Sequence, residues 1–382
     1  MRLLNHFRRP LLAAFCFAAG AMLGIPSFAQ QAQLQKLKAQ ADDVVVGINF
    51  THPLSLSVED QDVSLANLKA AGVRVIRVGF YSPELDNGID FIKRAYAQNI
   101  RVVLTVHSLA MPNAPKRASS PEFPGMYSGT PLSSIDLALS GQFFQQLMNK
   151  LDANGIVLAG MELENEINHP AFNAEFPLPG RAHKNLGLED FYHDPEGQQI
   201  AKGFLQYLKA LALLKQIRDQ SKANQHTPLI SAGLSPTGPA GPWSKQVDAA
   251  SPEATIGFLR ANGLDQLVDG YGMHIYPSRD HPGDSDAAAR RSQQVQEGIG
   301  LCSAAKPCWV TEWGFMDADK SCPPNDQATA SLVNETKNDF RPFVQERRLA
   351  ALMYYTWTGG EGHDVYRCGQ LTETGRRALA PM

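Results

Sequence analysis

The sequence predicts an α/β fold, a single-domain (β/α)8 TIM barrel, and three observations lead to this expectation. Short runs rich in β-branched and aromatic residues recur along the chain, with helical patterns between them. The runs number eight, which is the number of parallel strands that closes such a barrel. The chain of 382 residues is long enough for one barrel, which needs about 250 residues or more. The eight runs cover residues 44–50, 73–78, 100–106, 156–163, 229–232, 268–274, 309–312 and 351–357.

Helical patterns lie between these runs, at 89–98, 140–154, 198–220, 286–298 and 327–346. Two connections are instead long and rich in Pro, Gly and aromatic residues, at 108–134 after the third run and at 168–197 after the fourth. Long ordered loops at one end of a barrel usually form functional walls. We expect both loops to line a cleft, the alternative being a floppy surface insertion.

The first 29 residues differ from the rest and predict a secretory signal peptide. Arg2, Arg8 and Arg9 precede an apolar stretch of 15 residues at 11–25, and small residues follow at the expected cleavage point. The stretch is shorter than the ~20 residues that span a bilayer as a helix, so a retained anchor is the less favoured alternative. Residues 30–42 are expected to form a polar leader, and 43–382 the barrel. The expected location is secreted or periplasmic, without membrane contact after cleavage.

The charge balance excludes one class of partner. Loss of residues 1–29 leaves 32 basic against 38 acidic side chains, a net charge near −6. Nucleic-acid binders need basic surface to displace counterions, so no nucleic acid is expected as a partner. A neutral polymer is an easier substrate, and we expect the protein to act as a monomer.

Four cysteines remain in the mature chain, and their even number in an exported protein suggests two disulfides with three possible connectivities. Cys308 lies at the start of a predicted strand and Cys322 follows its far end. Bridged Cα atoms must lie within ~7 Å, whereas four or five strand residues span roughly 13 to 17 Å. We therefore expect bridges between Cys302 and Cys308 and between Cys322 and Cys368, the alternative being free buried thiols.

Polar or aromatic side chains stand at or just past the carboxyl end of seven of the eight predicted strands. Reactive groups of barrel enzymes sit at these strand ends. Two of the side chains are glutamates, and a pair of carboxylates is the minimum equipment for cleaving a glycosidic bond. The set comprises Asn49, Arg77, His107, Asn165, Glu166, His274, Tyr276, Glu312 and Trp357.

The order of these motifs resembles clan A of the glycoside hydrolases, the retaining (β/α)8 group that includes families 5 and 39. Asn165-Glu166 resembles the Asn-Glu of strand four in the clan, and Glu312 within Thr-Glu-Trp-Gly resembles its strand-seven nucleophile. His-Ile-Tyr-Pro at 274–277, Tyr-Thr-Trp at 355–357 and Arg77 fit the same pattern. The resemblance spans about residues 44–370.

The resemblance implies a role for each residue. Glu312 would be the nucleophile, and Glu166 the general acid that later acts as base. Arg77 and Tyr276 would donate hydrogen bonds to the nucleophile, and Asn165 would donate to the sugar 2-hydroxyl. His107 and His274 would complete the polar wall, and Trp357 would offer a flat floor to one sugar ring. Further candidates for sugar contacts are Asn49, His52, Tyr127, Trp243 and Trp313.

The acid has two competitors in its own segment, Glu162 and Glu164. Alternation places all three glutamates on one face of a continuous strand. Only Glu166 is preceded by Asn, so Glu166 is preferred.

No cofactor or metal is expected. The ten histidines contain no His-x-His or His-Glu-x-x-His pattern, and no lysine stands at a strand end to form a Schiff base.

The sequence therefore predicts a secreted retaining glycoside hydrolase or transglycosylase that acts on β-linked oligo- or polysaccharides. The alternative is a catalytically silent barrel that binds polysaccharide in an export or biofilm assembly. The sugar configuration and linkage are not predicted.

Overall fold

A computed structural model of the chain describes residues 44–123, 126–127, 129–181, 185–236, 247–279, 285–317, 319, 321–360 and 362–382. Residues 44–382 form one compact unit. The predicted signal peptide and leader lie outside the described residues. No described helix is both long and apolar enough to cross a membrane.

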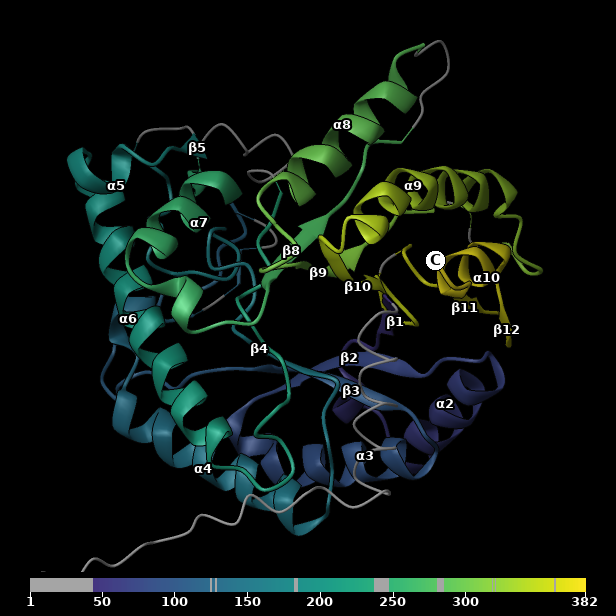
Figure 1. Cartoon of the computed structure of the whole chain (residues 1–382), viewed down its shortest axis with the longest axis horizontal. Coiled ribbons are helices and arrows are strands. Elements are labelled where there is room, and N and C mark those ends of the chain that lie inside the picture. Colours follow the sequence, from purple (N-terminus) through teal and green to yellow (C-terminus); the bar gives the residue numbers. More distant parts are fainter. Residues whose placement is uncertain are drawn as a thin grey trace, which may run out of the picture. The chain divides into compact units, whose positions relative to one another are not determined.

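The unit is built around one sheet of eight parallel strands (Figure 1). Neighbours in this sheet follow the order β6-β4-β3-β2-β1-β10-β9-β8, so consecutive strands of the chain lie side by side. Isolated parallel bridges between Ile230 and Gly270 and between Leu234 and Met273 bring the two edges together. The predicted (β/α)8 barrel is confirmed. The strands are β1 (Val45–Asn49), β2 (Val75–Phe80), β3 (Arg101–Val106), β4 (Gly160–Leu163), β6 (Leu229–Ile230), β8 (Tyr271–Ile275), β9 (Cys308–Trp313) and β10 (Leu349–Tyr354).

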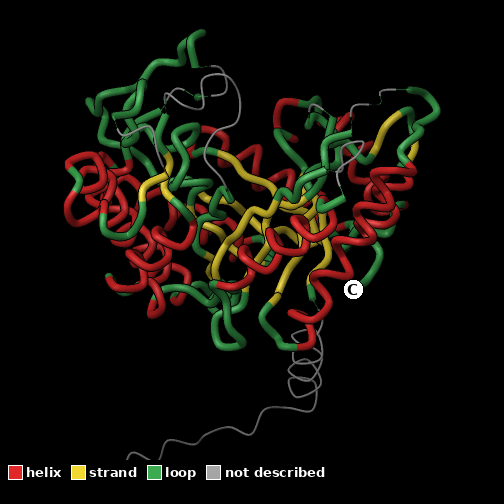
Figure 2. Tube along the Cα trace, turned by 90° about the horizontal axis from the view of Figure 1, so that it is seen from above, coloured by secondary structure: helices red, strands yellow, loops and turns green. Residues whose placement is uncertain are grey.

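Helices surround the strands, as Figure 2 shows, and at least one follows each strand along the chain. Side-chain caps fix where several of them begin: Ser57, Asp136, Asp194, Ser251 and Thr372 each accept a hydrogen bond from backbone N–H groups of the first turn. The helices are α2 (Val58–Ala70), α3 (Leu85–Ala97), α4 (Leu137–Ala153), α5 (Asp190–His193), α6 (Pro195–Asp219), α7 (Pro252–Ala261), α8 (Ala287–Gly300), α9 (Gln327–Gln345) and α10 (Glu373–Leu379). Two-residue strands also pair, β5 (Asn185–Leu186) with β7 (Ala249–Ala250) and β11 (Tyr366–Arg367) with β12 (Gln370–Leu371).

One layer of the barrel interior is apolar and tightly filled. Trp309 and Met353 pack there with Val75, Val103 and other small side chains. A Cβ at Gly47 would lie 2.6 Å from both the Val75 carbonyl oxygen and the end of the Met353 side chain. Such contacts are closer than van der Waals packing permits, so glycine makes room for the large side chains. Alternation along the strands then brings polar residues inward in the next layer toward the carboxyl ends, where the candidate site lies.

Most predicted elements are confirmed, with boundaries that are shifted or shorter in several strands. The fourth strand begins at Gly160 instead of at residue 156, because the Asn224 side chain bonds to the backbone of Ile156 and Leu158 at 2.9 Å each. The fifth strand covers Leu229–Ile230 alone. The helices α2, α5, α7 and α10 were not predicted, and α5 lies within the segment 168–197 that was expected to be a loop. In α2 the buried face consists of Gln61, Leu65 and Leu68, too few apolar positions for a clear helical pattern.

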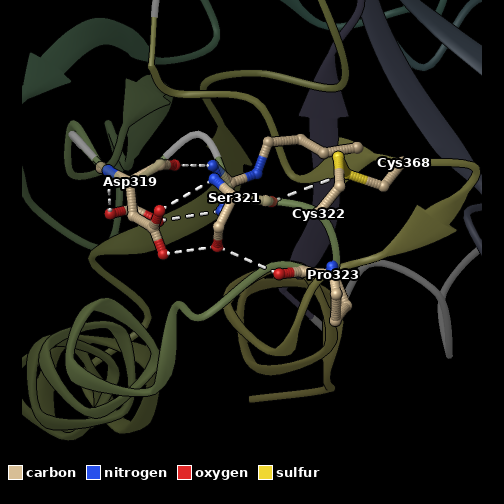
Figure 3. Close-up of a disulfide and its surroundings, with 7 residues drawn as sticks. Asp319, Ser321, Cys322, Pro323 and Cys368 are labelled. Atoms are coloured by element: carbon tan, nitrogen blue, oxygen red, sulfur yellow. Dashed lines mark hydrogen bonds and ion pairs between the residues drawn. A yellow bond between two sulfur atoms is a disulfide. The ribbon is translucent and has the colours of Figure 1, made fainter.

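Both predicted disulfides are confirmed. Cys302 and Cys308 are bridged with Cα atoms 5.5 Å apart, and Cys322 and Cys368 with Cα atoms 5.8 Å apart. The second bridge, drawn in Figure 3, joins the segment after β9 to the turn between β11 and β12. It therefore ties together the loops that follow the seventh and eighth barrel strands.

Candidate active site

Arg77 organises the polar layer of the barrel. It lies on β2 and is 7% exposed. Its guanidinium donates to Glu162 at 2.7 Å, to Glu312 at 2.6 Å, to Asn165 at 2.8 Å and to Asn49 at 2.9 Å. The fork of a guanidinium suits such simultaneous contacts with oxygens in one plane. Arg77 thus links residues from β1, β4 and β9 to β2.

Glu162 forms the floor of this network. The carboxylate is fully buried, and it accepts hydrogen bonds from Thr311 at 2.7 Å and from Thr105 at 3.2 Å in addition to those from Arg77. A buried carboxylate is tolerated where its lone pairs and its charge are satisfied in this way. Glu162 is therefore committed to holding Arg77 and has no access to solvent.

Glu312 is held in the ionised form. Its carboxylate accepts hydrogen bonds from Arg77 on one oxygen and from the Tyr276 hydroxyl, at 2.6 Å, on the other. Burial by itself would raise the pKa of Glu312, but the charges of His274 and Arg77, with the two hydrogen bonds, bring it below the usual value. Burial and the charge of Glu312 raise the pKa of Tyr276 well above its usual value, so its hydroxyl remains a donor.

Glu166 has a different environment. Its carboxyl contacts Nδ1 of His274 at 2.7 Å, and its side chain is 12% exposed. Burial lowers the pKa of His274, but the nearby Glu312 and Glu166 outweigh it and raise the pKa above its usual value. Nε2 of His274 is buried and has no hydrogen-bond partner among the described residues.

The carboxylates of Glu166 and Glu312, each 12% exposed, are close together. One ligand atom each from Glu166, His274 and Glu312 lies within 4.8 Å of the others. Two carboxylates and an imidazole at this spacing could also hold a metal ion. The Arg77 cation already lies 2.6 Å from Glu312, which disfavours a second cation at the same carboxylate.

A shift in strand register lets two successive residues of β9 reach the same network. His274 pairs with Glu312, whereas Met273 pairs with Val310, so Thr311 is the extra residue on β9. Such irregularities change the direction of side chains. Thr311 consequently bonds to Glu162 while Glu312 faces Arg77 and Tyr276.

The expectation that Glu162, Glu164 and Glu166 share one face of a continuous strand is wrong. Strand β4 ends at Leu163, and both Glu164 and Glu166 have positive φ, at 64° and 42°. Glu164 turns toward β3, where its carboxylate accepts hydrogen bonds from the Ser108 backbone N–H and hydroxyl and contacts Nδ1 of His107 at 3.1 Å. The three glutamates thus have three different sets of partners.

The other predicted site residues differ in accessibility. Asn49 is 2% exposed, and its amide donates to the carbonyl oxygens of Thr311, Met353 and Tyr354. Asn165 accepts from Arg77, and its amide nitrogen has no acceptor among the described residues, so it is available to a ligand. His107 stacks on the exposed ring of Tyr81, with the ring centroids 4.4 Å apart.

The aromatic candidates are mostly buried. Trp357 is 1% exposed and stacks on Tyr366, with the ring centroids 4.6 Å apart. Its role as a sugar floor stays a prediction. Trp313 is fully buried against Phe340, which contradicts a sugar contact. Trp243 lies outside the described residues. His52 is exposed and occupies the N-cap position of a short 3-10 helix after β1, without a side-chain capping bond among the described residues.

Sequence reasoning missed His363, which lies edge-to-face against Tyr276 and Tyr355 with centroids 5.8 and 5.4 Å away. It belongs to an irregular segment after β10, where no periodic pattern marks inward positions. The buried position of Glu162 did have a signal in the sequence, because alternation along the fourth strand points this residue into the barrel interior.

Comparisons with known proteins agree with the fold. No protein-family model and no curated protein matches the sequence. Among solved structures, a family 5 xyloglucanase from Paenibacillus pabuli superposes with a TM-score of 0.50 at 10% identity, covering 89% of this chain and 98% of that one. A GH5_18 protein from Streptomyces cattleya, in complex with GlcNAc, gives 0.50 at 13% identity, covering 89% and 79%. An exo-β-1,4-mannosidase from Opitutaceae bacterium strain TAV5 gives 0.50 at 12% identity, covering 88% of this chain and 58% of that one.

The chain thus spans less than two thirds of that mannosidase. At these identities the likeness is one of fold, and the resemblance to clan A is confirmed at that level: the molecule is a (β/α)8 barrel of the kind found in these glycoside hydrolases.

Proposed function

We propose that this chain is a secreted retaining glycoside hydrolase that cleaves β-linked glycosides or polysaccharides, with Glu312 as nucleophile and Glu166 as general acid and base. The observation that carries the proposal is the spacing of at most 4.8 Å between a carboxylate oxygen of Glu166 and one of Glu312. Retaining enzymes place their two carboxyl groups about 5 to 5.5 Å apart, whereas inverting enzymes leave ~6.5 Å or more for a water molecule.

In the first step, an oxygen of Glu312 attacks the anomeric carbon while the bond from that carbon to the departing oxygen breaks. Glu166 transfers its proton to the departing oxygen, and a glycosyl ester on Glu312 remains. In the second step Glu166 takes a proton from water, whose oxygen attacks the same carbon and releases Glu312. The two inversions leave the anomeric configuration retained.

The surroundings of each glutamate support this division of roles. Arg77 and Tyr276 bond to both oxygens of Glu312 and favour its charged form, as a nucleophile requires. His274 contacts one oxygen of Glu166, which leaves the other to carry the transferred proton. The free amide nitrogen of Asn165 fits donation to the sugar 2-hydroxyl, a bond that strengthens in the transition state.

Secretion is part of the proposal and is supported by the two disulfides, which form and persist in oxidising compartments. The apolar stretch at 11–25, which predicts a signal peptide, also supports secretion.

The test begins with mature protein and a panel of β-glucans, mannans, xylans and aryl β-glycosides, with reducing ends and the first product's anomer followed by NMR. We expect turnover of at least one substrate with retention. Glu312→Gln should abolish turnover while circular dichroism stays unchanged. Glu166→Ala should lower kcat/KM on oligosaccharides by about 10²- to 10⁴-fold.

Azide separates the two roles. With an activated aryl glycoside, azide should restore turnover of Glu166→Ala and yield the β-glycosyl azide, because the small anion attacks the glycosyl ester without needing a base. An inverted first product, or full activity in Glu312→Gln, would sink the assignment. Sugar binding without released reducing ends would favour the silent binding barrel.

A further inference from the structure

Two large aromatic side chains stand exposed beside the candidate site without serving the core. Tyr127 is 58% exposed and Phe172 is 44% exposed, and their ring centroids lie 5.3 Å apart. They come from different segments, Tyr127 from the loop after β3 and Phe172 from the loop after β4. Leaving both rings in water forgoes the stabilisation that burial would give, so their exposure calls for a ligand.

The backbone beneath the two rings is firmly held. The Tyr127 N–H donates to the Ala171 carbonyl at 3.2 Å. The Arg117 guanidinium donates to carbonyl oxygens of both segments, including those of Tyr127, Pro170 and Asn173. A small apolar cluster formed by Phe123, Met126, Ala171 and Val247 lies in the same region. The rings are therefore presented by a fixed surface, which keeps the entropic cost of binding low.

This surface is connected to the candidate acid. The Glu166 carbonyl accepts from the His169 N–H at 2.9 Å, and the His169 carbonyl accepts from the Phe172 N–H at 3.2 Å. Phe172 is thus two hydrogen-bonded turns from Glu166. Tyr127 is connected to the site through Tyr355. Burial raises the pKa of Tyr355 to about 12, and the nearby Glu312 and Tyr127 raise it further. Tyr127 therefore lies within electrostatic reach of the residues around Glu312.

We propose that Tyr127 and Phe172, here called the aromatic platform, bind a pyranose ring of the substrate on the leaving-group side of the cleaved bond. This inference rests on the proposed function, because the leaving-group side is defined by Glu166 as proton donor. The C–H face of a pyranose is apolar and matches an aromatic ring. Two half-exposed rings offer on the order of 100 Å² each, far below the ~800 Å² per partner of a stable protein interface.

The test uses an aryl β-glycoside donor that the panel shows to be cleaved, with free oligosaccharide as acceptor. Aryl release needs no sugar on the leaving-group side, whereas transfer to an acceptor sugar does. In Tyr127→Ala and Phe172→Ala we expect the ratio of transfer to hydrolysis to fall about 5- to 10-fold, with kcat/KM for aryl release unchanged. KM for oligosaccharides should rise by a similar factor.

Tyr127→Phe keeps the ring and should keep most of the transfer, while Tyr96→Ala removes a tyrosine that is 37% exposed on α3 and should change nothing. Thermal unfolding shows whether the alanine variants keep the fold; if one does not, the serine variant at the same position, assayed at lower temperature, replaces it. An unchanged transfer ratio, or equal losses in aryl release and transfer, overturns the platform.

The proposed function fails separately, if the wild type cleaves nothing. In that case calorimetric titration of wild type and Phe172→Ala with the same oligosaccharides decides the platform, since equal affinities would refute it.

Discussion

The ionisation of Glu312 depends on individual donors, and Tyr276 is the one that can be removed with least disturbance. Its hydroxyl stabilises the charged carboxylate at 2.6 Å, so its loss must raise the pKa of Glu312. A hydrogen bond to a charged group contributes about 1.5 to 3 kcal/mol, and one pKa unit corresponds to about 1.4 kcal/mol.

In Tyr276→Phe we therefore expect the acidic limb of the kcat/KM profile to move to higher pH by about one to two units. The sign follows because the catalytic form is the ionised one, and a raised pKa removes that form at a higher pH. Tyr355→Phe is the matched control, since no hydrogen bond joins Tyr355 to Glu312 among the described residues. A limb that stays in place, or moves to lower pH, contradicts the assigned donor.

Single residues also mark how far sequence reasoning reached. Arg77, Asn165, Glu166, His274, Tyr276 and Glu312 were proposed from their places at strand ends. The structure brings them into one network, in which Nδ1 of His274, 3.6 Å from Glu312, joins Glu166 to the others. Asn49 accepts a hydrogen bond from Arg77 and donates to backbone carbonyl oxygens of the barrel, and its contact with sugar stays a prediction. A strand end gives the location of a side chain, whereas its partners depend on neighbours distant in the sequence.

Among the elements, the end of β6 controls the position of His274. A Cβ at Gly233 would lie 2.2 Å from Nε2 of His274 and 2.7 Å from the Thr311 hydroxyl. Both neighbours are packed in the barrel, so they cannot yield without disturbing Glu166 or Glu162.

Gly233→Ala should therefore lower kcat by about tenfold or more, because a misplacement of about 1 Å can cost up to 10²-fold. Steady-state kinetics on an aryl glycoside measures the effect. Gly300→Ala, at a position with open space around it, is the matched control and should leave kcat unchanged. Equal kcat in both variants would show that His274 does not position Glu166.

Strand prediction worked best where inward and outward side chains alternate regularly. It worked less well where a side chain, instead of a neighbouring strand, bonds to the backbone. Residues 156–159 have a β-rich composition, yet Asn224 takes their backbone bonds. The register shift in β9 and the positive φ values at Glu164 and Glu166 have no composition signal at all. These irregularities lie at the site, where local preferences give way to tertiary constraints.

At the scale of the whole molecule, the two disulfides should differ in their effect on stability. The Cys322–Cys368 bridge spans 46 residues and the Cys302–Cys308 bridge spans 6. Loop-closure entropy then gives about 4 kcal/mol for the long loop and about 2 kcal/mol for the short one.

We expect serine replacement of Cys322 and Cys368 to lower the free energy of unfolding by about 4 kcal/mol, and replacement of Cys302 and Cys308 by about 2 kcal/mol. Urea unfolding of the two double variants measures both values. The exposed Cys322–Cys368 bridge should also be reduced first by dithiothreitol, since Cys302 and Cys308 are buried. The reverse order of stabilities would show that local strain or residual structure outweighs loop length.

The sequence by itself determined the eight strands with helices between them, the cysteine pairing and the strand ends that carry the two glutamates. Each follows from local periodicity or from the distance that a short segment can span. Tertiary structure alone decided which side chains meet. Barrel closure brings residues 77, 162 and 312 together from three strands, and the guanidinium that bonds to both carboxylates helps His274 to lower the pKa of Glu312. The same closure separates Glu164 from Glu166, because hydrogen bonds from the segment just after β3 hold the one and His274 from β8 contacts the other.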